Sequence, residues 1–269
     1  MPLIDPLFSF APLRRAIWAH WYPFVTRRLR DDGVIFLNYG FETDPPWGLR
    51  LDAADEANRA CIQLYHHVAT PADLRGKHVL EISCGHGGGA SYLTRTLAPA
   101  RYAALDLNPT GIAFCRARHC VDGLTFVQGD AENLPFAEAT FDAVINVEAS
   151  HCYPSLARFF AEVARVLRPG GHFLYADFRF ESYLPAWEKA LAAAPLRLQA
   201  MRVINTSVLR GMKLNSARSA ELIARHLPRW VQSLGRDFAG VEGSRIYNAL
   251  EKNELSYRSY HFAKPGAAV

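Results

Sequence analysis

The sequence predicts an α/β protein built on a mostly parallel sheet with helices on both faces. From residue 77 onward, short apolar runs typical of buried strands alternate with segments of helical periodicity. A glycine-rich turn follows the first of these runs, and a helix-forming segment follows the turn. This order is typical of a ligand site at the carboxyl edge of a parallel sheet. With 269 residues, half of them hydrophobic, the chain can bury one large core.

The elements can be placed in chain order from these patterns. The pattern predicts strands over 77–82, 102–106, 124–128, 141–147 and 171–177, and helices over 51–69, 88–97, 109–118 and 155–168. After residue 177 comes an insertion of about 50 residues, rich in alanine and leucine, which we expect to be helical. The segments 238–241 and 255–262 then close the chain. The second alternates polar and apolar residues, which favours an antiparallel edge strand.

Charge is concentrated at the N-terminus. Residues 1–30 carry five arginines against one aspartate, so this arm holds the whole formal charge of +4 and the rest of the chain balances to zero. A neutral body does not resemble the surface of a nucleic-acid enzyme. Aromatic residues lie among the arginines, and Pro12 and Pro23 interrupt the arm, which predicts one or two short amphipathic helices. The arm could simply cap the fold, cover an apolar substrate or touch a membrane surface.

The cysteines and the absence of targeting signals indicate a reducing cytosol. The five cysteines form no paired spacing, no apolar run approaches the length of a membrane span, and the start lacks the charged region of a secretory signal. Cys115, His119 and Cys120 could share a helix face, but nothing elsewhere completes a four-ligand zinc site. We therefore expect no metal.

The glycine turn and a downstream acid indicate a nucleoside site. Gly85 and Gly87 allow the sharp turn and the close approach of a ligand to the backbone. Asp106 ends the next predicted strand, 21 positions after Gly85, where a carboxylate can accept hydrogen bonds from ribose hydroxyls. A nicotinamide and an adenosylmethionine site both need this acid. Alternatively, Asp106 is a solvated acid before the helix start at Asn108 and Pro109.

Four runs of the sequence together resemble class I adenosylmethionine-dependent methyltransferases. They are Glu81-Ile-Ser-Cys-Gly-His-Gly87, Gly129-Asp-Ala-Glu-Asn-Leu-Pro-Phe136, Phe141-Asp-Ala-Val144 and Val166-Leu-Arg-Pro-Gly-Gly171. The chain differs from the usual pattern in having Glu81 in place of Asp and Ser83 in place of Gly. More narrowly, Leu37-Asn-Tyr-Gly-Phe41 and Asn146-Val-Glu-Ala-Ser-His-Cys-Tyr153 resemble the mycobacterial phthiotriol/phenolphthiotriol dimycocerosate methyltransferases.

The resemblance implies a Rossmann-like fold, a seven-stranded sheet with one antiparallel strand, and S-adenosyl-L-methionine as cofactor. It divides the chain into a helical arm or lid (1–33), a donor-binding core (34–180), a helical acceptor-pocket insertion (181–235) and C-terminal strands (236–269). The donor-binding residues that it implies are Tyr39, Glu81, Ser83, Gly85, Gly87, Asp106, Leu107, Asp130, Ala131 and Asn146. Among them Asp106 would hold the ribose, and Leu107, Asp130 and Ala131 the adenine. Asp130 could instead be a turn residue after Gly129.

His151 and Asp177 are the candidate catalytic residues. Each follows or ends a predicted strand, so both should project into the same crevice. A histidine held by a carboxylate is a suitable general base near neutral pH, and this pair also matches the His and Asp of sugar O-methyltransferases. Alternatively, His151 packs at a helix start while Asp177 faces solvent.

The acceptor is less well defined than the donor. The resemblance favours a hydroxyl of a lipophilic molecule, such as a lipid, polyketide or glycolipid. A carboxylate acceptor would need no base, and an alkene carbon would need aromatic faces such as Trp18, Trp21 and Tyr22. Residues 146–149 lack the turn of amino-directed enzymes, which speaks against nucleobase amines. The Gly129 and Arg168-Pro-Gly-Gly171 runs disfavour an NAD-dependent oxidoreductase. Contact of the arm with a membrane and self-association stay open.

Overall fold

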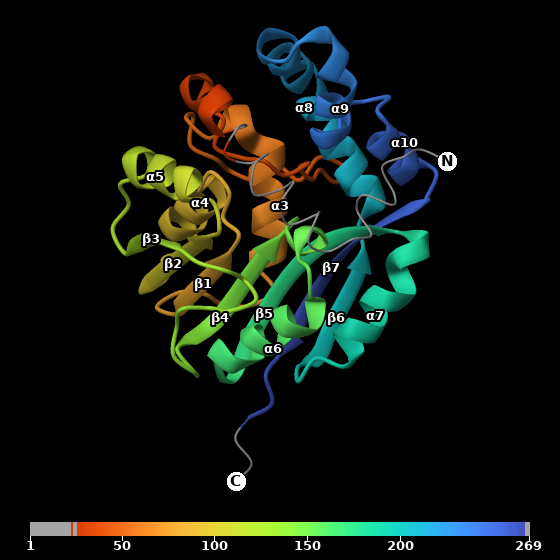
Figure 1. The fold of residues 1–269 in the computed structure, drawn as a ribbon. Helices are drawn as coiled ribbons and strands as arrows, with labels where there is room; N and C mark the ends of the chain where they lie inside the picture. The colour runs from red at the N-terminus through yellow and green to blue at the C-terminus, as the bar shows by residue number, and fades with distance from the viewer. Residues whose placement is uncertain (1–22, 24–25, 267–269) are drawn as a thin grey trace.

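The structure is a computed structural model that describes residues 23 and 26–266. Its centre is a seven-stranded sheet in the order β3-β2-β1-β4-β5-β7-β6 (Figure 1). Strands β1 to β5 pair in parallel, whereas β7 is antiparallel to both of its neighbours, β5 and β6. The strands are β1 (His78–Ile82), β2 (Arg101–Asp106), β3 (Leu124–Gln128), β4 (Phe141–Val147), β5 (Leu167–Phe180), β6 (Arg197–Val203) and β7 (Leu255–Ala263). The predicted α/β class with a mostly parallel sheet is confirmed.

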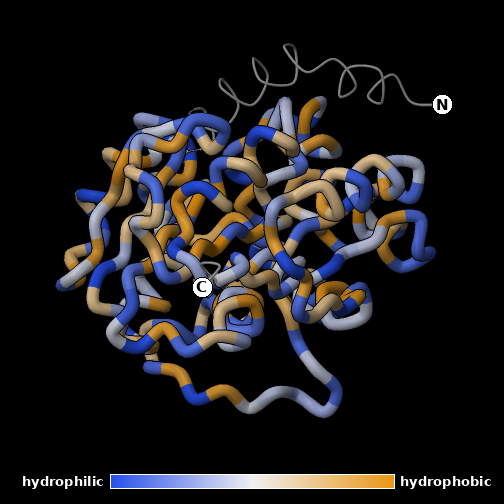
Figure 2. The backbone as a smooth tube through the Cα atoms, turned by 90° about the horizontal axis from the view of Figure 1, so that it is seen from below, coloured by the Kyte–Doolittle hydropathy of each residue, from blue (hydrophilic) through white to orange (hydrophobic). Residues whose placement is uncertain are grey.

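Helices cover both faces of this sheet. In the described chain the longer ones are α3 (Arg59–Ala69), α4 (Gly88–Leu97), α5 (Pro109–Arg118), α6 (Leu156–Val166), α7 (Leu184–Ala192), α8 (Asn205–His226), α9 (Gln232–Phe238) and α10 (Arg245–Glu251). Neighbouring strand residues such as Val79 and Leu80 belong to two separate buried clusters, because successive side chains of a strand point to opposite faces. One cluster packs under α3, α4 and α5, and the other under α6 and α7. Figure 2 shows the hydrophobic segments concentrated toward the middle of the molecule.

Local sequence signals explain where several helices begin. The Asn108 side chain accepts a hydrogen bond from the backbone N–H of Thr110, and Pro109 occupies the first helical position of α5. The Ser155 side chain caps α6 in the same way, accepting from the N–H of Arg158. At α4, a side chain at Gly89 would clash with the ring of Tyr65. The glycine run is therefore needed for close packing of α4 against α3 as well as for the turn.

The C-terminal third corrects three expectations. The insertion is not helical throughout, because it contains β6, whose seven residues are all exposed and carry no continuous apolar run. The strand expected at the edge is β7, which lies between β5 and β6 and buries Leu255, Tyr257 and Phe262. The segment 238–241 forms no strand, since Phe238 is the last residue of α9. A fourth correction lies outside this third of the chain: the helix expected over 51–69 begins at Arg59, after the short 3-10 turn η2 (Glu56–Asn58).

Three further expectations can be compared with the described residues: those on the N-terminal arm, on membrane-spanning helices and on metal sites. The candidate substrate residues Trp18, Trp21 and Tyr22 lie outside the described residues. Among the helices that the structure describes, none is both long and apolar enough to cross a bilayer. The described side chains include no group of three or more His, Cys, Asp or Glu residues placed to hold a metal ion. Instead, Cys115 donates to the carbonyl of Gly85, and His119 bonds to the carbonyl of His86, so both support the glycine turn.

The carboxyl edge of the sheet is where a ligand site is expected. The strand order reverses between β1 and β4, and ligands of open parallel sheets bind in the crevice outside such a point. Helices α8, α9 and α10 lie beyond this edge, above the strand tips in Figure 1.

Candidate functional site

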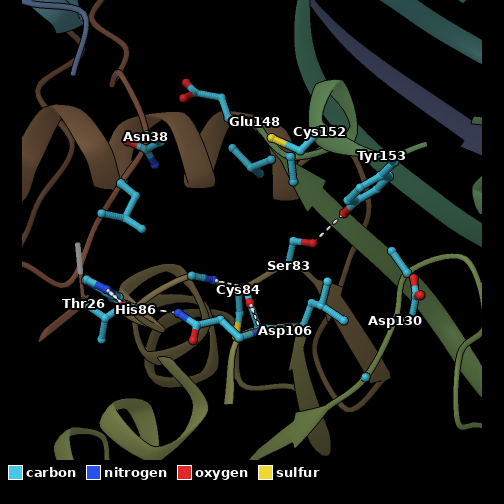
Figure 3. Close-up of a pocket in the computed structure, with 18 of the residues that line it drawn as sticks. Thr26, Asn38, Ser83, Cys84, His86, Asp106, Asp130, Glu148, Cys152 and Tyr153 are labelled. Atoms are coloured by element: carbon cyan, nitrogen blue, oxygen red, sulfur yellow. Dashed lines mark hydrogen bonds between the residues drawn. The ribbon is translucent and has the colours of Figure 1, made fainter. Parts of the chain in front are cut away.

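A cavity of about 250 Å³ opens at the carboxyl ends of β1, β2 and β4 (Figure 3). We call it the donor cavity. Six of the residues predicted to bind the donor line it, namely Ser83, Gly85, Asp106, Leu107, Asp130 and Ala131. The structure thus brings together side chains that are up to 48 positions apart in sequence, because parallel strands deliver their carboxyl ends to one edge.

Asp106 is held in place beside the glycine turn. Its Oδ2 accepts a hydrogen bond from the N–H of Gly85 at 2.9 Å, and its Oδ1 accepts one from the N–H of Asn108 at 2.9 Å. The next residue, Leu107, leaves 43% of its surface exposed although it lines the cavity. A fixed carboxylate next to an exposed apolar side chain fits a nucleoside, since the first can bind ribose hydroxyls and the second can cover a base.

Ser83 explains how the chain tolerates a departure from the usual glycine. Its φ of 61° lies in the left-handed region, which favours glycine. The serine hydroxyl forms a 2.6 Å hydrogen bond with the hydroxyl of Tyr153, which also accepts from Asn146 at 2.9 Å. These contacts offset part of the conformational cost and fix one wall of the donor cavity, as Figure 3 shows.

Four predicted donor-binding residues do not line the donor cavity. Glu81 is buried beneath it, and its two oxygens accept hydrogen bonds from Tyr65 and Tyr102. Burial raises the pKa of Glu81 to about 7. Gly87 needs its lack of a side chain for packing, because a Cβ there would meet Phe126 at 2.9 Å. The sequence pattern identified the turn correctly, but these two residues support it from below.

The other two such residues are Asn146 and Tyr39. Asn146 is fully buried and donates to the carbonyl of Ile82, which ties the end of β4 to that of β1. The Tyr39 ring stacks on Phe178 with 5.4 Å between ring centroids. Both residues therefore fix the walls of the site, and neither offers its side chain to the donor cavity.

The end of the N-terminal arm reaches the donor cavity. Pro23 and Thr26 line it, and Thr26 Oγ1 lies 2.9 Å from Nε2 of His86 in the glycine turn. The amide of Asn108 also donates to Thr26 Oγ1, at 3.2 Å. Figure 3 shows Thr26 and His86 on one side of the cavity, opposite Tyr153 and Asp130. This part of the arm therefore forms part of the cavity wall.

His151 and Asp177 are in direct contact, as the hypothesis of a catalytic pair requires. Nδ1 of His151 lies 2.8 Å from Oδ1 of Asp177. Oδ2 of Asp177 accepts further hydrogen bonds from the hydroxyl of Ser150 at 2.6 Å and from the backbone N–H of His151 at 2.9 Å. Arg179 completes the cluster, with Nη1 3.1 Å from the same carboxylate. The pair adjoins the donor cavity through Cys152, which lines it.

The charges around His151 favour its protonated form. Burial alone would lower the pKa of His151, but Cys152 and the carboxylate of Asp177 outweigh that effect and raise the pKa to about 10. Burial also acts to raise the pKa of Asp177. The adjacent Arg179 and His151 overcome this and hold that pKa well below the usual range of a carboxyl. The imidazole therefore keeps its proton to a higher pH than a histidine of ordinary pKa near 6.5.

Known proteins place the chain in a family. A model described as "Methyltransferase domain" matches residues 80–175. The phthiotriol/phenolphthiotriol dimycocerosates methyltransferase of Mycobacterium tuberculosis is 57% identical over 250 residues, which is 93% of each chain. That of Mycobacterium leprae is 54% identical over the same length. The chain belongs to this methyltransferase family. Family membership removes the oxidoreductase hypothesis.

A further relative of similar identity is named for a different substrate. The fatty-acid O-methyltransferase of Mycolicibacterium smegmatis is 53% identical over 248 residues, covering 91% of this chain and 88% of the relative. Among solved structures, the [4+2]-cyclase SpnF superposes with a TM-score of 0.69 at 20% identity, over 93% of this chain and 95% of that one. A geranyl diphosphate methyltransferase gives 0.63 at 18%, over 86% and 100%. These two structures share the fold.

Sequence reasoning missed two acidic residues that line the donor cavity of this methyltransferase, Glu132 and Glu148, and the second has the more unusual setting. Glu148 has a left-handed φ of 50° and lies on the far side of the cavity from Asp106 in Figure 3. Its carboxyl group accepts from the N–H of Tyr39 at 3.0 Å and from the hydroxyl of Tyr257 at 2.7 Å. Burial raises the pKa of Glu148 to about 8. Its place directly after the predicted strand 141–147 was the available signal.

Proposed function

We propose that the protein is an S-adenosyl-L-methionine-dependent O-methyltransferase that acts on a hydroxyl group of a lipophilic molecule. The observation that carries the proposal is the contact between His151 and Asp177 at the border of the donor cavity. A base is needed for a hydroxyl acceptor, because the oxygen must lose its proton as it gains the methyl group. A histidine held in place by a carboxylate can provide this base.

The donor cavity is the proposed site of S-adenosyl-L-methionine. Asp106 would hold the ribose and Leu107 would cover one side of the adenine, with Asp130 and Ala131 at its edge. Ser83 and Gly85 would face the amino-acid part. When bound, the cofactor supplies an electrophilic methyl group on its sulfonium. The protein then contributes mainly orientation, because the methyl group is already activated.

His151 would act through Nε2, because Asp177 binds the other ring nitrogen at 2.8 Å. The carboxylate keeps a proton on Nδ1 and stabilises the charge that the ring gains on taking a second proton. Since the pKa of His151 is raised to about 10, only a small share of the enzyme carries the free base at neutral pH. Turnover of a hydroxyl should therefore increase toward alkaline pH.

A lipophilic acceptor is supported by the family. The relatives at 57% and 54% identity are named for dimycocerosates, and the relative at 53% is named for fatty acids. Each is matched over about nine tenths of this chain, so the acceptor side is included in the likeness.

The cationic state of His151 favours a second candidate, methylation of a fatty-acid carboxylate. An imidazolium next to the donor cavity would attract a carboxylate, which is already ionised and needs no base. The M. smegmatis relative named for fatty acids supports this alternative. The two candidates assign opposite protonation states to the same side chain.

Labelled donor and two acceptors, a long-chain secondary alcohol and a long-chain fatty acid, would test the proposal with the parent enzyme and His151→Ala. For the alcohol, we expect His151→Ala to lower kcat by about 10²–10⁴-fold, the usual contribution of a general base. Affinity for adenosylhomocysteine should stay unchanged. For the fatty acid, the variant should mainly raise KM, because an ion-pair partner is lost. Near-parental kcat of His151→Ala on the alcohol would contradict the general-base proposal.

A further inference from the structure

A second cavity, of about 150 Å³, lies next to the donor cavity. Helices α3, α8 and α9 and the segment before residue 39 form its walls. Most of its lining is apolar, with the side chains of Leu29, Phe36, Leu222, Ile223, Leu227 and Phe238 among them. We call it the tail cavity.

One short strip of chain separates the two cavities. Phe36, Leu37 and Asn38 line both of them. Leu37 also packs against the glycine turn, since a Cβ on Gly85 would lie 3.3 Å from its Cδ1. A molecule in the tail cavity and a molecule in the donor cavity would therefore be separated only by the side chains of this strip.

Two aromatic residues, Tyr39 and Phe178, lie between this strip and His151. Tyr39, the residue that follows the strip, stacks on Phe178 with a centroid separation of 5.4 Å. Phe178 in turn packs on the ring of His151 at 4.5 Å. Asn215, which lines the tail cavity, donates to the carbonyl of Tyr39 at 3.2 Å. Buried side chains thus fill the space between the tail cavity and His151, so an acceptor would reach the proposed base from the donor cavity.

The polar residues of the tail cavity bind other parts of the protein. Arg218 donates to the carbonyl of Ala57 at 3.2 Å and to Asn58. Nε2 of His226 lies 2.6 Å from the carboxylate of Asp32. Arg218 thus binds neutral oxygens and His226 binds an acid, and most of the remaining lining is apolar. An aliphatic ligand fits the remaining apolar lining.

We propose that the tail cavity receives the hydrocarbon chain of the acceptor, while the acceptor's oxygen lies past the strip, in the donor cavity on the side of Cys152 and His151. The inference rests on the proposed function and makes it narrower, because it requires an acceptor with an extended aliphatic chain. Burial of that chain would supply binding energy away from the reacting oxygen. The tail cavity therefore selects the acceptor by chain length, and the donor cavity plays no part in that selection.

The test is to change the size of the tail cavity and measure chain-length preference. Ala239 lies in its lining, so Ala239→Phe should fill part of it. We expect kcat/KM for a long-chain acceptor to fall about tenfold or more, the scale of a misfit in a hydrophobic pocket. A short-chain acceptor with the same reacting group should be affected much less. Affinity for adenosylhomocysteine, measured by calorimetric titration, should not change.

Two further variants complete the experiment. Leu222→Ala should enlarge the cavity and shift the preference toward longer or bulkier chains, which keeps the proposal testable if Ala239→Phe does not fold. Ala217→Phe places the same ring on an exposed part of α8 and should leave the preference as in the parent. An unchanged preference in both cavity variants, with a parent enzyme that methylates long-chain acceptors, would overturn the tail-cavity proposal. A parent enzyme that methylates no such acceptor would instead count against the proposed function.

Discussion

The donor cavity and the tail cavity lie on two sides of residues 36–38 but are built in different ways. The walls of the donor cavity are strand ends and tight turns, and hydrogen bonds from the backbone N–H of Gly85 and Asn108 fix its key carboxylate. The tail cavity is enclosed mainly by apolar side chains on helices. Polar groups fixed by backbone hydrogen bonds suit a ligand that is always the same. Side chains on helices, in contrast, can be substituted without disturbing the sheet. On the proposed assignment of the two cavities, the fold keeps donor recognition apart from acceptor selection.

Among the substitutions that test this comparison, Asp106→Ala should have the largest effect on ligand affinity. We expect Asp106→Ala to weaken adenosylhomocysteine binding by about 1.5–3 kcal/mol, the usual value of hydrogen bonds to a charged group. Isothermal titration would measure it, with Asp122→Ala, an exposed acid on the loop before β3, as the matched control. The chain-length preference of the residual activity should stay parental. If the folded variant bound adenosylhomocysteine as the parent does, Asp106 would not hold the ribose.

A smaller effect is expected at Ser83. Ser83→Gly removes the hydrogen bond to Tyr153, which costs about 0.5–1.5 kcal/mol, but it also relieves the left-handed backbone conformation. The two effects oppose each other, so the free energy of unfolding and the affinity for adenosylhomocysteine should each change by less than about 1 kcal/mol. A severe loss of adenosylhomocysteine affinity, with the free energy of unfolding almost unchanged, would show that the serine hydroxyl itself contacts the donor.

The lining of the donor cavity was predictable in part because it follows from backbone geometry. Asp106, Leu107, Asp130 and Ala131 lie at or just after the ends of predicted strands, and parallel strands bring such positions together. Glu81 and Gly87 carry the same motif signal yet lie beneath the turn, because a motif records what a turn needs as well as what touches a ligand. The tail cavity left no such signal. Leu222, Ile223 and Phe238 look like ordinary core residues of amphipathic helices until their packing is known.

The position of His151 was predictable, but its charge was not. The ends of neighbouring strands implied that His151 and Asp177 would project into the same crevice, but their contact could be seen only in the structure. The sequence did not indicate that Ser150 and Arg179 would join the same buried cluster, since they act through tertiary contacts. An ordinary histidine would titrate near 6.5, whereas this cluster raises the pKa of His151 to about 10.

Strand β6 was not predicted because none of its residues is buried, so its sequence carries no apolar pattern typical of a strand.

The pH dependence of kcat/KM with a long-chain alcohol tests the central claim most directly, because it reports the protonation state that the free enzyme needs. If His151 is the base, the rate should rise with pH through a pKa above 6.5 and toward 10, as the ring loses its proton. Asp177→Asn removes the charge that raises this pKa, so the rise should move to lower pH. A rate that falls as His151 loses its proton, or a profile that Asp177→Asn leaves in place, would contradict the general-base account.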